Sequence, residues 1–194
     1  YGPSILAIPY IWVIDKWYSL KGKNLQEKAI TSSTIGFEKN ISSSLLAISA
    51  SILFLLSLHL TKSIPKSMLV TFLFSFCTIV FSTISRGLWQ HTGSILLLSI
   101  VLYLFSLKKS VYLILSAIPL YFSYVVRPTN LLPIFFISLV VIYLLRKNSI
   151  YFLGLGFLIL ISFFYINQIV FGSITHPYYD FRKVKFRRYL PDLS

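Results

Sequence analysis

Acidic residues are scarce in this sequence: five of its 194 residues are Asp or Glu, against 18 that are Lys or Arg. Charged residues of both signs make up only 12%, whereas an ordinary soluble domain has about 25%. Too little polar material is present to cover the core of a soluble globular protein of this length. The apolar content of 56% excludes a disordered chain, and the single cysteine, Cys77, excludes a disulfide scaffold. A polytopic membrane protein is the class that remains.

The motifs of soluble enzymes are also absent. The sequence contains no glycine-rich phosphate loop, no CxxC pair, no HExxH zinc motif and no GxSxG nucleophile elbow. Its five acids are scattered over polar segments, so no two carboxylates are placed for acid–base catalysis. The chain begins at Tyr1 and stops at Ser194 within a polar segment, from which we expect an internal fragment of a longer protein. The catalytic residues are unknown and are expected upstream of Tyr1.

Long apolar runs dominate what is present, and the mean hydropathy is +0.79. A membrane-spanning helix needs about 20 mostly apolar residues, and six runs reach or approach that length. Because the runs do not alternate between apolar and polar residues, they indicate helices rather than the strands of a barrel. We therefore predict an all-α bundle of about six transmembrane helices, at residues 41–60, 66–84, 88–107, 110–126, 131–145 and 150–171.

Two polar regions flank this bundle, which we place at residues 41–171. Residues 1–40 are predicted to form an interfacial helix followed by a polar linker. The helix, at 3–20, has only about ten clean apolar residues, is interrupted by Pro9, and carries the Trp and Tyr residues that favour membrane interfaces. Residues 172–194 are expected to be a basic, aromatic, extracytoplasmic tail that leads into an outer loop, with Gly172 as the C-cap of the last helix.

The net charge of +13 suggests anionic partners. In a soluble protein it would suggest nucleic acid. Here the cations lie between apolar runs, so membrane lipids or a phosphorylated lipid are the expected partners, and nucleic acid is not. Three short turns, at Lys62, Lys108 and Arg146, share one side of the predicted membrane and hold six cations. The other side holds the remaining twelve, so a count of cations leaves the orientation open.

Two groups of polar residues on that other side are candidate binding residues. Arg127 precedes Pro128, which disfavours helix at the preceding residue, so its guanidinium is expected at headgroup level, where it can bind a phosphate with two hydrogen bonds. Arg86, Trp89 and His91 place a cation, an indole and an imidazole close together in sequence, which suits a polar pocket. The alternatives are a snorkelling arginine and an interfacial loop with an aromatic anchor. His91 has no second ligand one helical turn away, so no metal site is predicted.

Four short motifs resemble those of integral-membrane glycosyltransferases of the GT-C fold, which are related to protein mannosyltransferases and aminoarabinose transferases. Residues 1–10, YGPSILAIPY, are similar to the family's YPPG…LLA.P segment, which follows its first outer loop. Residues 85–91 resemble its SR…(D/H) turn, with His91 where several relatives have an acid. Residues 126–130, VRPTN, resemble the turn whose cation contacts the lipid-linked phosphate. Residues 167–173, followed by Tyr178, resemble its N…FGSP…Y exit into a second outer loop.

The resemblance implies a multi-pass enzyme of the plasma (cytoplasmic) membrane that transfers a sugar from a polyprenyl-phosphate donor to an extracytoplasmic acceptor. It implies that Arg127, Arg86, His91 and Trp89 bind the donor. A carboxylate of the first outer loop, before Tyr1, would act as base. No cofactor is expected beyond this lipid-linked phosphosugar, and no residue pattern supports a divalent metal. The resemblance also places Arg127 on the outer face and the three short turns in the cytoplasm.

Two alternatives from other classes stay open. A polytopic transporter or flippase for a lipid-linked sugar would carry charged residues at mid-membrane and discontinuous helices, and the centres of the predicted spans lack charges. An O-antigen polymerase-like membrane protein is also basic and aromatic, and paired arginines in a large outer loop would favour it.

Overall fold

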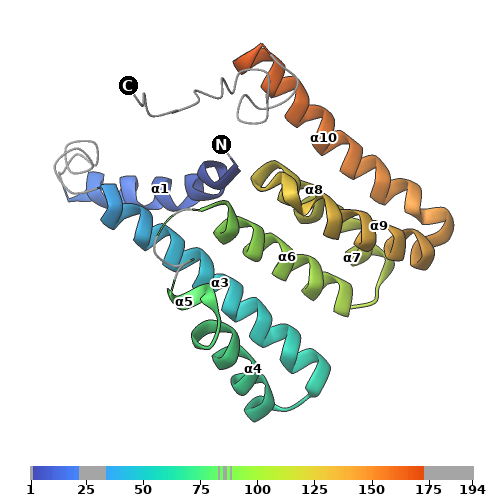
Figure 1. Ribbon diagram of the computed structural model, residues 1–194, viewed down its shortest axis with the longest axis horizontal. Helices are drawn as coiled ribbons and strands as arrows, with labels where there is room; N and C mark the ends of the chain where they lie inside the picture. The colour runs from blue at the N-terminus through green and yellow to red at the C-terminus, as the bar shows by residue number, and fades with distance from the viewer. Residues whose placement is uncertain (1, 22–33, 83, 85–86, 88, 173–194) are drawn as a thin grey trace, which may run out of the picture.

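The computed structural model describes residues 2–21, 34–82, 84, 87 and 89–172, and these residues contain helices but no strand (Figure 1). The predicted all-α class is therefore confirmed. The α-helices in chain order are α1 (Gly2–Leu20), α3 (Thr34–Thr61), α4 (Ile64–Phe76), α5 (Ile79–Ser82), α6 (Gln90–Ser106), α7 (Ser110–Leu115), α8 (Ala117–Val126), α9 (Leu131–Leu145) and α10 (Ser149–Phe171). Two short 3-10 turns, η2 (Pro128–Asn130) and η3 (Arg146–Asn148), flank α9.

The helices α4, α3, α6, α8 and α10 lie side by side in one row (Figure 1). α3 packs most extensively on α6 and α4, and α8 packs on both α6 and α10. The largest buried cluster lies where α6, α8, α9 and α10 meet, and it includes Val101, Leu120, Val141 and Phe152, all fully buried. α1 lies across one end of the row, against α6 and α8. Along the helix axes the bundle therefore has two distinct ends, and the connections between helices form them.

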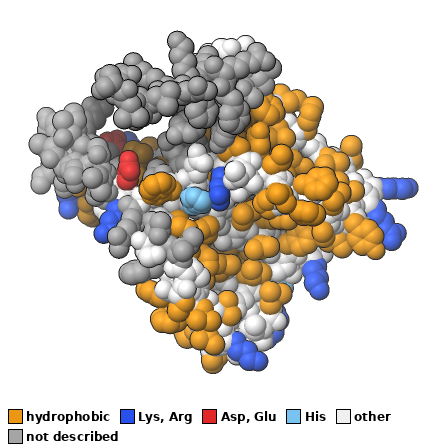
Figure 2. Space-filling view, in the orientation of Figure 1, with side chains coloured by type: hydrophobic (Ala, Val, Ile, Leu, Met, Phe, Trp, Pro, Cys, Tyr) orange, Lys and Arg blue, Asp and Glu red, His pale blue; other side chains and the backbone are white. Residues whose placement is uncertain are grey.

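Several serine and threonine side chains are buried between helices, whereas many large apolar side chains are exposed. Ser49 in α3 and Ser99 in α6 are buried, and each hydroxyl donates to the carbonyl one turn earlier, at 2.9 and 2.8 Å. Leu132 and Phe157, in contrast, are both 65% exposed, and Figure 2 shows how widely apolar side chains cover one face. Small hydroxyl residues allow helices to approach closely within a bilayer, where lipid covers the apolar side chains. This distribution suits a surface in contact with lipid.

Two segments are long and apolar enough to cross a membrane, judged by length and composition: Glu38–Thr61 and Pro128–Val170, the second of which includes both α9 and α10. The apolar helices Ile64–Phe76, Gln90–Ser106 and Ser110–Val126 are shorter. With a rise of about 1.5 Å per residue, α4 reaches about 20 Å, whereas the hydrocarbon core measures about 30 Å. The described helices thus support association with a membrane, and the number of six spans stays a prediction.

The apolar run at residues 66–84 does not form one continuous helix. α4 ends at Phe76, and the short helix α5 follows after a bend. In this bend Thr78 Oγ1 donates to the carbonyl of Phe74 at 2.6 Å and accepts a hydrogen bond from the backbone N–H of Val80 at 3.2 Å. The Thr78 hydroxyl thus bonds to backbone groups that would pair with other backbone groups in a continuous helix. The helix is therefore interrupted here.

The N-terminal helix is confirmed as a helix, with Pro9 inside it. Ala7 is buried against the bundle, whereas Trp12 and Trp17 are 62% and 57% exposed, as expected of a helix at a membrane surface. Its interfacial position stays a prediction. α3 begins at Thr34, so the end of the predicted linker is helical. Residues 22–33 of that linker and the tail at 173–194 lie outside the described residues.

Candidate functional site

The segment before α6 is held by hydrogen bonds from two helices. The carbonyl of Gly87 accepts hydrogen bonds from Ser42 Oγ of α3 and, at 3.3 Å, from Thr92 Oγ1 of α6. Thr92 Oγ1 also lies 3.2 Å from the carbonyl of Ile84. Both hydroxyl residues are fully buried. The start of α6 and the segment that carries Trp89 are therefore tied to α3.

The turn after α8 is held in the same way. Pro128 follows Arg127, whose backbone is extended at φ −147° and ψ 102°, so α8 ends at Val126 as the sequence predicts. Asn130 is buried, and its Nδ2 donates to Ser94 Oγ of α6 at 2.7 Å and to the carbonyl of Ser123 at 3.2 Å. One amide thus joins the start of α9 to α6 and α8.

Gly93 allows three helices to approach one another at this point. A Cβ atom on Gly93 would lie 2.6 Å from Leu6 Cδ1 of α1 and 3.0 Å from Val126 Cγ1 of α8. A side chain here would therefore require the Leu6 and Val126 side chains to move. We call the end of the bundle formed by Gly87, Gly93, Asn130 and their neighbours the polar end.

Three of the candidate residues of the sequence analysis, Trp89, His91 and Arg127, lie at this polar end. His91 stands two residues before Gly93, and Arg127 follows Val126 directly. His91 and Trp89 are exposed, the latter by 60%, while Arg127 is half-buried. Figure 2 shows a histidine side chain beside a Lys or Arg side chain on this face of the molecule. Arg86 lies outside the described residues. The positions of three candidates are thus established, and their binding role stays a prediction.

Acidic and metal-binding groups are sparse in the part of the chain that the structure describes. Its two acids, Asp15 in α1 and Glu38 near the start of α3, are both exposed. Within these residues no three His, Cys, Asp or Glu side chains are grouped to hold a metal ion. The described polar end therefore offers a cation, an imidazole, an indole and backbone groups, which together suit an anionic or sugar-bearing ligand.

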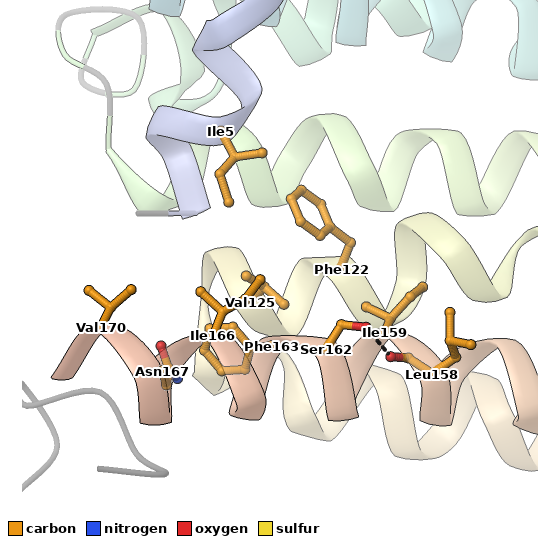
Figure 3. A pocket seen from close by; sticks show the side chains of 10 residues that line it. All are labelled: Ile5, Phe122, Val125, Leu158, Ile159, Ser162, Phe163, Ile166, Asn167 and Val170. Atoms are coloured by element: carbon orange, nitrogen blue, oxygen red, sulfur yellow. Dashed lines mark hydrogen bonds between the residues drawn. The ribbon is translucent and has the colours of Figure 1, made fainter. Parts of the chain in front are cut away.

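An apolar cavity of about 300 Å³ lies between α1, α8 and α10, and sequence reasoning did not find it (Figure 3). In Figure 3, Ile5 of α1 and Phe122 of α8 lie on the side of the cavity opposite α10. Only two polar side chains line it, Ser162 and Asn167; the Ser162 hydroxyl donates to the carbonyl of Leu158 at 2.8 Å. Its full lining is Ile5, Phe122, Val125, Leu158, Ile159, Ser162, Phe163, Ile166, Asn167 and Val170.

The cavity reaches the polar end along α8. Val125, in its wall, precedes Arg127 by two residues at the end of the same helix. Asn167, the first residue of the segment that resembles the N…FGSP…Y exit, is buried here. The other lining residues carry no sequence signal, because apolar residues inside a cavity look like apolar residues that face lipid. Only the packing of three helices distinguishes them.

Comparison of the chain with protein-family models, with curated proteins and with solved structures finds no significant match. The resemblance to GT-C glycosyltransferases therefore rests on the short motifs alone. The function must be argued from the polar end and from the cavity beside it.

Proposed function

We propose that this chain belongs to a multi-pass membrane glycosyltransferase of the GT-C type, which transfers a sugar from a polyprenyl-phosphate donor to an extracytoplasmic acceptor. The observation that carries the proposal is the position of Arg127. It is a half-buried cation at the end of α8, the helix that forms one wall of an apolar cavity. An anionic group attached to a long apolar chain satisfies both features at once.

The cavity suits the isoprenoid part of such a donor. Its lining is apolar except for two side chains, and its volume of about 300 Å³ accommodates several isoprene units. An apolar chain in this position would cover Phe122 and Val125, and would lead toward the end of α8. The phosphate at the head of the chain would then lie at the level of Arg127.

Arg127 is suited to hold the phosphate during transfer. In the proposed reaction the acceptor hydroxyl attacks the anomeric carbon, the bond between that carbon and the phosphate oxygen breaks, and the polyprenyl phosphate leaves with the electron pair. A guanidinium can donate two parallel hydrogen bonds to phosphate oxygens and so stabilise the charge that develops on them. The hydroxyl proton passes to a carboxylate that we expect outside the described residues.

His91 and Trp89 would contact the sugar. Both lie at the start of α6 and are exposed at the polar end. The indole of Trp89 offers an apolar face for a sugar ring, and the His91 imidazole can donate or accept one hydrogen bond with a sugar hydroxyl. The segment before Trp89 is fixed by Ser42 and Thr92 through Gly87, so these side chains start from a rigid backbone.

The test is a transfer assay with the full-length protein in membranes and a radiolabelled polyprenyl-phosphate sugar. We expect Arg127→Ala to lower turnover at sub-saturating donor at least tenfold, because a charge-assisted hydrogen bond contributes about 1.5–3 kcal/mol. Arg127→Lys should lower it less, because lysine keeps the charge and loses the planar fork. Lys39→Ala is the matched control: it removes an exposed cation of α3 that the proposal does not place against the donor.

Unchanged turnover of Arg127→Ala with normal expression would contradict the phosphate-binding role. Equal losses in Arg127→Ala and Lys39→Ala would indicate a general effect of charge. A protein that moves the donor between leaflets without transferring the sugar would favour the flippase alternative over the transferase.

A further inference from the structure

Three turns of the described chain contain a non-glycine residue with a positive φ angle, and in each case the residue is a cation. Lys62 has φ 53°, Lys108 has φ 55° and Arg146 has φ 49°. Lys62 and Arg146 directly follow the last residues of α3 and α9, and Lys108 stands two residues after the end of α6. All three lie at the end of the bundle opposite the polar end (Figure 1). We call these three residues, together with Lys66, Lys109 and Lys147, the basic rim.

This backbone conformation is unfavourable for lysine and arginine. An L-residue at positive φ brings its Cβ close to the backbone, whereas glycine adopts the conformation freely and asparagine tolerates it. At ψ −114°, Arg146 lies in a region that turns usually fill with glycine. The turns therefore carry strain that glycine would relieve. Lysine or arginine nevertheless stands at all three positions.

The helix dipole does not account for the choice. Cations are favourable near the C-terminus of a helix, and a cation in the last helical turn would gain this without a strained backbone. The last turns of α6 and α9 contain no basic residue, and that of α3 contains only His59. The cations stand instead in the connecting turns, just beyond the ends of the helices.

The surroundings of the basic rim indicate what binds there. All six cations are exposed, and Figure 2 shows Lys and Arg side chains projecting along this edge. The described acids, Asp15 and Glu38, belong to α1 and to the start of α3, at the other end. Each turn is followed by a strongly exposed aliphatic residue: Ile64 at 56%, Val111 at 63% and Ile150 at 65%.

We propose that the basic rim binds the headgroups of anionic phospholipids and holds this end of the bundle at one face of the membrane. An anionic lipid offers a phosphate to the cations and an acyl chain to the aliphatic residues beside them. A nucleic acid or an acidic protein would leave those aliphatic residues in water. The proposal rests on the membrane location in the proposed function and not on the transferase activity.

The experiment uses the full-length protein in bilayers of phosphatidylcholine mixed with phosphatidylglycerol. Native mass spectrometry gives the ratio of the two lipids that stay bound. The test variant combines Lys62→Gly, Lys108→Gly and Arg146→Gly. Each lost cation should weaken the preference for phosphatidylglycerol about fivefold, and all three about a hundredfold. The same variant should unfold at a higher temperature than the wild type, because glycine relieves the strain.

The matched control combines Lys16→Gln, Lys21→Gln and Lys39→Gln, which removes three exposed cations from the other end. It should keep the preference for phosphatidylglycerol. The proposal is wrong if the glycine variant keeps that preference, or if the control loses as much. Failure of the wild type to insert into either bilayer would overturn the membrane location and the basic rim together. Normal insertion and lipid preference without sugar transfer would contradict only the proposed transferase.

Discussion

The two ends of the bundle both carry cations, but they hold them differently. At the polar end, Arg127 is half-buried in a turn that Asn130 ties to neighbouring helices through hydrogen bonds of 2.7 and 3.2 Å. At the basic rim, Lys62, Lys108 and Arg146 are exposed in short turns with strained backbones. The polar end thus holds Arg127 half-buried in a hydrogen-bonded turn, whereas the basic rim spreads six exposed cations along an edge.

The surroundings of a cation, and not the number of cations, distinguish a specific phosphate site from a surface that attracts any anion. A guanidinium in a rigid, partly buried turn can select one phosphate geometry, because it does not need to be ordered on binding. Exposed cations are attracted to any anionic surface, and added salt screens this attraction.

The polar end and the basic rim should lie on opposite faces of the membrane. A cysteine at one end should therefore be labelled from outside the cell, and a cysteine at the other end should not. In a protein with Cys77→Ser, we expect the Thr129→Cys variant to react with an impermeant maleimide in intact cells and the Lys109→Cys variant to be protected. Both positions are exposed in the structure. Labelling at 109 with protection at 129 would reverse the orientation, and equal labelling would place both ends on one side.

Hydrogen bonds should matter more at the polar end than at the rim. Asn130→Leu removes the amide that joins α9 to Ser94 and Ser123, and we expect a loss of about 1–3 kcal/mol in the free energy of unfolding. Ser149→Ala is the control at the rim, since its hydroxyl bonds only to the carbonyl of Arg146 at 2.6 Å in an exposed turn. It should change stability by less than about 0.5 kcal/mol. Denaturant titration in detergent measures both, and similar values would remove the contrast.

The close approach of α1, α6 and α8 should be sensitive to added volume. Gly93→Val would insert methyl groups between Leu6 and Val126, at a cost of about 1–3 kcal/mol. Gly154→Ala is the control, because no atom lies within 4 Å of the added Cβ. Alanine is the better helix former, so this variant should be equal to the wild type or up to about 1 kcal/mol more stable. A thermal shift in detergent compares them, and tolerance of Gly93→Val would show that the helices are loosely packed there.

Local features were predictable from sequence because they depend on neighbouring residues. α8 ends at Val126, two residues before Pro128, as expected from the restriction that Pro128 places on Arg127. Gly172 caps α10 at φ 65°, with its N–H 3.0 Å from the carbonyl of Gln168, as predicted for a C-cap glycine. The break after Phe76 was missed, since the hydrogen bonds of a threonine side chain are not visible in a hydropathy profile.

The sequence by itself determined that the chain is helical and apolar, and that cations stand in its turns, because these properties follow from composition and short-range order. Tertiary structure decided where the helices meet. Ser94 and Asn130 are 36 residues apart, and Ile5 and Asn167 lie near opposite ends of the described chain, yet the first pair shares a hydrogen bond and the second lines one cavity. Apolar residues that face lipid and those that face another helix have the same hydropathy, so only close packing in three dimensions distinguishes them.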